Sequence, residues 1–153
     1  PMLNWQAAPD DIKAFETQAG FTGPKESTVS NGAIQRLQYS KKTETDEFTE
    51  LFIHLYDLRD GKLIQATSIA IPNDYIYQIS GDAINPYQYF IDMVKKDGYT
   101  SRKGENGRQV YDNQAKGNKF TFETWSNIKV NGFTMKGAGM AFVPFDGPDE
   151  IDY

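Results

Sequence analysis

The sequence predicts an α+β fold, in which a curved antiparallel sheet of about six to eight strands carries an N-terminal helix and one amphipathic helix over residues 85–97. Phe and Tyr, which favour strands, are frequent, with 10 and 9 copies. An Asp-Gly pair and an Asn-Gly pair lie between apolar runs, as they do in tight hairpins. One segment repeats apolar residues at helical spacing. A β-sandwich with an inserted helix is the alternative.

The 153 residues suit a single globular domain, 1–153, with a short acidic C-terminal tail over residues 146–153. Apolar residues make up 39% and charged residues 24%, the range of folded globular chains. The absence of cysteine excludes disulfides and thiolate metal sites. No signal peptide and no membrane-spanning run is visible, so we expect a soluble chain without membrane insertion, in a compartment that the sequence leaves open.

The first half of the chain begins with a predicted helix and continues with predicted strands. Proline suits a first helical turn and glycine a helix end, so the helix should begin near Pro9 and stop before Gly20. Residues 22–32 read as a loop. Strands are expected at 33–39, 48–56 and 63–71, with a charged connection at 41–47 and a hairpin at Asp60-Gly61. The strand at 48–56 is apolar on both faces, which predicts a central strand covered on each side.

The second half contains the amphipathic helix and the remaining strands. A strand is expected at 74–79, and Asn85-Pro86 then begins the helix, as a cap and a first residue. Further strands are expected at 108–111, 119–125, 128–130 and 133–142, with Asn131-Gly132 turning the last hairpin. Gly137 and Gly139 lie on one face of the last strand, which indicates a bulge or a close backbone approach.

Charge is unevenly distributed along the chain. Residues 95–119 hold seven basic and three acidic side chains, whereas the whole chain has a net charge of −5. An acidic body argues against nucleic-acid binding, while the basic segment suits an anion or a partner. The tail at 146–153 reads as a solvated segment that is also able to dock on a basic partner.

Catalytic and cofactor motifs are weak. The single histidine, His54, lies mid-strand, and no G-x-S-x-G sequence accompanies it. One histidine without cysteine leaves only oxygen ligands for a metal, and no phosphate loop is present. We therefore expect no cofactor and no metal, and favour a chain that is not an enzyme. A carboxylate-based hydrolase or isomerase, with Glu50 and Glu123 as candidates, remains the last alternative.

Aromatic clustering is the strongest functional signal. Tyr75 and Tyr77 lie on one side of the strand expected at 74–79. Tyr89 and Met93 fall off the apolar stripe of the predicted helix, which predicts exposure for these two side chains. The leading hypothesis is a non-catalytic protein-binding domain (an inhibitor, an immunity-type protein or a secretion-accessory protein) that uses this aromatic patch with a charged rim.

The alternative is a protein that binds a small apolar ligand in a pocket between sheet and helix. Such a pocket would be lined by His54 and Trp125, together with Phe52 and Tyr56 on the same predicted strand face as His54. Another protein is thus the expected partner, and a small molecule the second.

Overall fold

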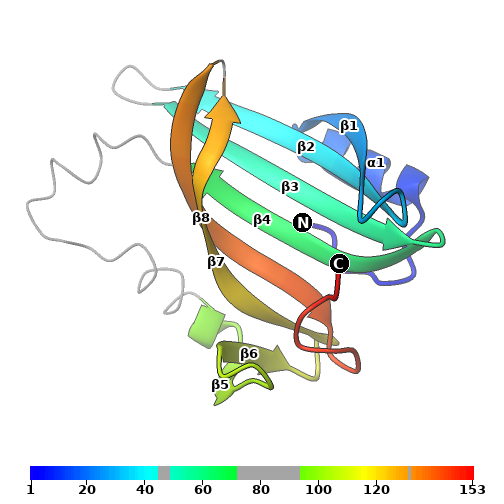
Figure 1. Ribbon diagram of the computed structural model, residues 1–153, viewed down its shortest axis with the longest axis vertical. Coiled ribbons are helices and arrows are strands. Elements are labelled where there is room, and N and C mark those ends of the chain that lie inside the picture. The colour runs from blue at the N-terminus through cyan, green and yellow to red at the C-terminus, as the bar shows by residue number, and fades with distance from the viewer. Residues whose placement is uncertain (45–48, 72–93, 131) are drawn as a thin grey trace, which may run out of the picture.

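The computed structural model describes residues 1–44, 49–71, 94–130 and 132–153 (Figure 1). Besides a helical turn at 94–96, the elements are α1 (Pro9–Gln18), β1 (Thr22–Val29), β2 (Ile34–Glu44), β3 (Thr49–Arg59), β4 (Lys62–Ile71), β5 (Thr100–Lys103), β6 (Gln109–Asn113), β7 (Asn118–Val130) and β8 (Phe133–Pro144). An N-terminal helix and antiparallel strands confirm the predicted α+β class.

The strands form one open antiparallel sheet of eight strands, in the order β1-β2-β3-β4-β8-β7-β6-β5. The order shows that β1 to β4 are added one after another, and that β5 to β8 return from the far edge until β8 pairs with β4. The two halves of the chain are therefore joined through the β4–β8 pairing. Because one sheet holds all the described strands, the alternative of a β-sandwich is not supported.

Both predicted hairpins are present. Asp60 and Gly61 have φ angles of 52° and 76°, the left-handed pair that a type I′ turn requires, and Arg59 pairs with Lys62 across them. In the second hairpin, Val130 pairs with Phe133. The central position of β3 is also confirmed, because β2 and β4 flank it.

The edges of the sheet differ from the prediction. Residues 22–29 were expected to form a loop, but they form β1, and residues 41–44 extend β2 into the expected connection. The side chains of β5 (100–103) are all exposed, and none in β1 is buried. An edge strand is held by backbone pairing on one side, so it needs no apolar alternation that a sequence would reveal.

The predicted amphipathic helix lies mostly outside the described residues. Within 85–97, the structure describes a helical turn at 94–96, where Val94 is buried. The predicted strand at 74–79 also lies outside the description. The amphipathic helix and this strand stay predictions.

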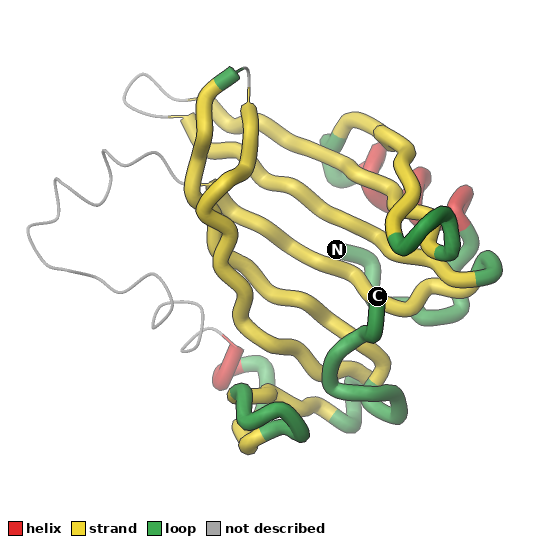
Figure 2. Tube along the Cα trace, viewed as in Figure 1, coloured by secondary structure: helices red, strands yellow, loops and turns green. Residues whose placement is uncertain are grey.

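The two faces of the sheet are covered by different segments. Alternate residues of a strand point to opposite faces, and His54 bonds to Glu16 of α1, so His54 and Tyr56 lie on the side that we call the helix face. Leu55 points to the other side, which we call the strap face because the C-terminal segment crosses it (Figure 2).

The main core lies on the helix face. One cluster joins Tyr56, Leu37 and Ile12, and a second is built around Phe120 and Phe142 on the other half of the sheet. Trp5 packs against both clusters. The N-terminal segment thus connects the two halves of the core. Helix α1 contributes little apolar area, since its two buried side chains are Ile12 and Glu16.

Gly139 lies where β8 approaches β4 too closely for a side chain. A Cβ atom at this position would lie 1.8 Å from the carbonyl oxygen of Ser68, so the predicted close backbone approach is confirmed here. We expect Gly139→Ala to lower the free energy of unfolding by about 1–3 kcal/mol, because β8 must shift away from β4. Urea denaturation measures this change.

Gly147→Ala is the matched control. The nearest atom to its added Cβ would be the carbonyl oxygen of Pro144 at 3.4 Å, and its φ is not in the left-handed region. This variant should stay within about 0.5 kcal/mol of the parent. Equal effects of the two substitutions would contradict the steric explanation.

Candidate functional site

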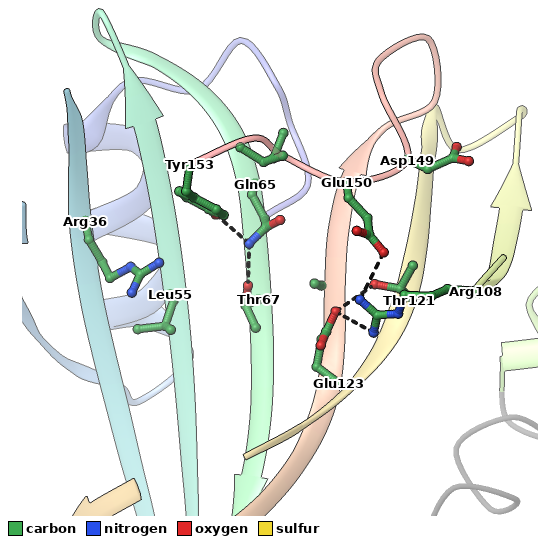
Figure 3. Close-up of a pocket in the computed structure, with 12 residues that line it drawn as sticks. Arg36, Leu55, Gln65, Thr67, Arg108, Thr121, Glu123, Asp149, Glu150 and Tyr153 are labelled. Carbon is green, nitrogen blue, oxygen red and sulfur yellow. Dashed lines mark hydrogen bonds and ion pairs between the residues drawn. The ribbon is translucent and has the colours of Figure 1, made fainter. Parts of the chain in front are cut away.

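A cavity of about 320 Å³ lies on the strap face, between the sheet and residues 145–153, which we call the strap (Figure 3). The sheet and the loop before β6 contribute Arg36, Leu55, Gln65, Thr67, Arg108, Thr121, Glu123 and Ala141, and the strap contributes Asp149, Glu150, Ile151 and Tyr153. The cavity therefore joins both halves of the sheet to the C-terminal segment.

The floor of the cavity is one row of side chains across four neighbouring strands. Leu55 of β3 pairs with Thr67 of β4, Thr67 pairs with Ala141 of β8, and Ala141 pairs with Thr121 of β7. Directly paired residues share a face of the sheet, so the register alone brings these four side chains together. The row alternates apolar and hydroxyl groups.

Arginine side chains stand on opposite sides of the cavity (Figure 3). The guanidinium of Arg36 donates two hydrogen bonds to Asp57, at 2.7 and 3.0 Å. Arg108 forms ion pairs with Glu123 at 2.8 Å and Glu150 at 3.0 Å. Hydrogen bonds from Arg36 to Asp57 raise the pKa of its guanidinium, so both walls carry a fixed but neutralised positive charge.

The strap is tied down by a buried ion pair. Asp149 is 7% exposed and accepts hydrogen bonds from Arg102 at 2.7 Å and from Lys119 at 2.9 Å. Lys119 is itself 5% exposed. The backbone N–H of Glu105 also donates to Asp149. Hydrogen bonds from Arg102, with help from Lys119, hold the pKa of Asp149 well below its usual range.

The end of the strap is fixed above β3 and β4. The Tyr153 hydroxyl donates to Asp57 at 2.5 Å and accepts from the Gln65 amide at 2.8 Å. Arg59 donates to the carbonyl oxygen of Asp152 at 2.9 Å. The ring of Tyr153 thereby lies beside the cavity, next to Gln65 (Figure 3).

These contacts place the acidic tail, residues 146–153, in a different environment from the one that the sequence predicts. The sequence suggested a solvated segment, but the strap docks on the basic segment of its own chain through Arg102, Arg108 and Lys119. The basic segment was an anion or partner site in the sequence prediction. Three of its cations are instead neutralised within the molecule.

A second polar cluster lies on the helix face, around Glu16. Its side chain is fully buried, and its carboxylate accepts a hydrogen bond from the Tyr56 hydroxyl and lies 2.8 and 3.0 Å from His54 Nδ1. The Met2 backbone N–H donates to the Tyr56 hydroxyl at 2.6 Å. Phe21 stacks on the imidazole, with ring centroids 4.2 Å apart.

Burial and hydrogen bonding oppose each other in this second cluster. Burial alone would raise the pKa of Glu16, but hydrogen bonds from His54 and Tyr56 outweigh it and the pKa is lowered. Burial lowers the pKa of His54, and the hydrogen bond to Glu16 offsets this only in part. A neutral imidazole that donates from Nδ1 to a charged carboxylate fits both shifts.

The predicted site residues are only partly within the description. His54 is bound to Glu16 on the helix face, whereas the cavity described above lies on the opposite face. Trp125 lies in β7, paired with Gly137, and its side chain is not described. The remaining predicted site residues, Tyr75, Tyr77, Tyr89 and Met93, lie outside the described residues.

Sequence reasoning missed the residues that line the cavity. The alternation of Gln65 and Thr67 with Ala66 on β4 was an available signal, because it marks a polar face on a central strand. The arginines gave no such signal. Their position depends on strands that are distant in the sequence.

Among the described residues, no three His, Cys, Asp or Glu side chains are grouped in a way that would hold a metal ion. The helices within this description are too short and too polar to cross a membrane.

Comparison with protein-family models, with curated proteins and with solved structures finds no match for this chain. The described part of the chain combines an N-terminal helix with one antiparallel sheet, and a cavity lies beside its C-terminal strap.

Proposed function

We propose that this chain is a non-catalytic binding protein that holds a small polar molecule in the strap cavity. One observation carries the proposal: the cavity of about 320 Å³ is lined on one side by a segment that ion pairs hold in place. Ligand sites are usually preformed hollows of roughly 300–1,000 Å³ with a few placed polar groups, so this cavity suits a small ligand.

The chemistry of the walls favours binding over catalysis. A general acid or base works best when its pKa lies near the working pH. Here hydrogen bonds from Arg102 lower the pKa of Asp149, and hydrogen bonds to Asp57 raise the pKa of the Arg36 guanidinium. Burial alone would lower the pKa of Arg108, but Glu123 and Glu150 outweigh it and the pKa is raised. Each shift moves the pKa of the group further from neutral pH. The histidine of the chain faces the opposite side of the sheet.

The earlier protein-binding hypothesis stays a prediction. Its residues, Tyr75, Tyr77, Tyr89 and Met93, lie outside the description, so no described contact supports or opposes an aromatic docking patch. The cavity favours the small-molecule alternative of the sequence analysis, with two changes. The ligand site moves from the helix face to the strap face, and the ligand becomes polar.

A fragment screen tests the proposal. We expect ¹H–¹⁵N correlation spectra of the whole chain, recorded with a library of small polar compounds, to shift amide signals along the floor row at Leu55, Thr67 and Thr121. Ala141→Leu fills the space above this row and should weaken binding of any such compound at least about tenfold. Thermal unfolding of the variant checks that it remains folded.

Ala115→Leu makes the same substitution at an exposed position away from the cavity, and it should bind as the parent does. The proposal fails if no compound shifts the floor signals. It also fails if a compound that shifts them binds equally well to the folded Ala141→Leu variant.

A further inference from the structure

The charges around the strap cavity are already paired, and this limits the ligands that it can accept. Arg36 is bound to Asp57, Arg108 to Glu123 and Glu150, and Asp149 to Arg102 and Lys119. A charged ligand finds no unpaired counter-charge among the described lining residues, so it would lose its hydration without a charge to replace it. A neutral ligand has no such cost.

Hydrogen-bonding capacity nevertheless remains on several lining groups. The Arg36 guanidinium has five N–H donors, of which Asp57 uses two. Arg36 also interacts with the Tyr153 hydroxyl, so donors remain beyond those that serve Asp57 and Tyr153. The Gln65 amide donates from Nε2, while its carbonyl oxygen has no described donor. The Thr67 hydroxyl accepts from Gln65 and still has its own hydrogen to donate. Donors and acceptors therefore face the cavity together.

Hydroxyl groups match this mixture best, since each donates one hydrogen bond and accepts others. Planar side chains such as Arg36 and Gln65 are suited to pairs of adjacent hydroxyls, because their neighbouring polar atoms lie in one plane. The ring of Tyr153 adds an apolar surface beside them, on which C–H groups can pack. A volume of about 320 Å³ has room for one or two sugar rings.

We infer that the ligand of the strap cavity is a neutral carbohydrate, a mono- or disaccharide held by Arg36, Gln65 and Thr67 with Tyr153 at its side. This inference rests on the proposed function and specifies the ligand class. It depends on the pairing of every described charge that lines the cavity, together with free donors and acceptors on the same walls.

Ligands with one scaffold and different charge provide the test. The whole chain is titrated with D-glucose, D-galactose, D-mannose, maltose and lactose, and with glucuronate and glucosamine as anionic and cationic counterparts. Amide shifts of the floor row are followed in each titration. We expect at least one neutral sugar to bind there, at least about tenfold more tightly than either charged analogue.

Removal of one hydroxyl locates the site. Thr67→Val keeps the shape of the side chain and should weaken binding of the best sugar about three- to tenfold. Ser68→Ala removes the hydroxyl of the next residue, which points to the helix face, and should leave the affinity unchanged. Thermal unfolding of both variants confirms that the comparison is made between folded proteins.

The possible failures are distinguishable. If polar fragments bind at the floor row and the neutral sugars do not, the carbohydrate inference is wrong and the proposed function stands. If glucuronate or glucosamine binds more tightly than the neutral sugars, the carbohydrate inference is likewise wrong and the proposed function stands. An equal loss of sugar affinity in Thr67→Val and Ser68→Ala also overturns it. If neither fragments nor sugars shift the floor signals, the inference and the proposed function both fall.

Discussion

Replacement of Asp149 by asparagine is expected to lower the free energy of unfolding by about 3–5 kcal/mol, because it removes one partner of a buried ion pair. Asp149 and Lys119 are both nearly inaccessible to water, and the Lys119 Nζ atom lies 2.9 Å from Oδ1 of Asp149. Asparagine has almost the shape of aspartate but no charge, so the Lys119 ammonium would stay buried without a carboxylate. Urea denaturation near neutral pH measures the loss.

Two further variants separate charge from shape. Asp146→Asn neutralises an exposed acid of the same strap and should change stability by less than about 0.5 kcal/mol. The double variant Lys119→Met with Asp149→Leu removes both charges and should recover most of the loss, because apolar replacements of buried pairs are often neutral. A stable Asp149→Asn variant, or a double variant as unstable as the single one, would contradict this account.

Glu16→Ala should cost a similar amount, about 3–5 kcal/mol, because it breaks the second buried cluster. Without the carboxylate, the Tyr56 hydroxyl loses its acceptor and the His54 imidazole loses the partner of Nδ1. The substitution also leaves a cavity where helix α1 packs on β3. Glu16→Gln keeps the volume and one acceptor oxygen, so a smaller loss of roughly 1–3 kcal/mol is expected.

Glu26→Gln is the control for these changes. Glu26 lies in β1 and is exposed, so the same exchange of charge for amide should have little effect on stability. If Glu16→Ala unfolds at the same urea concentration as the parent, the buried cluster does not contribute to stability.

Acid should reveal both titrating groups of the cluster. Burial lowers the pKa of His54 in the folded chain. Its contribution to the free energy of unfolding is therefore complete above about pH 6.5, the ordinary histidine pKa, and is lost as the pH falls through the lowered pKa. Hydrogen bonds lower the pKa of Glu16 in spite of burial, so its contribution is complete above about pH 4.3 and is lost in stronger acid. The stability difference between the parent and Glu16→Gln should therefore shrink below that second value.

Local signals were sufficient for much of the fold. Asp60-Gly61 and Asn131-Gly132 encode turn geometry in two residues, and Pro9 and Gly20 bound a helix by their own backbone preferences. The long strand at β3 was visible because both of its faces are apolar. The edge strands β1 and β5 were not visible, since backbone pairing with a neighbour requires no particular side chains.

The cavity and the buried cluster depended on contacts that no local pattern contains. Glu16 and His54 are 38 residues apart, and Arg102 and Asp149 are 47 apart. The sequence alone determined that the chain has basic and acidic segments, one histidine and two tight hairpins. Only the tertiary structure decided that the acidic strap pairs with three cations of the basic segment and lines a cavity together with the floor row. The physical reason is register, since pairing between distant strands decides which side chains share a face.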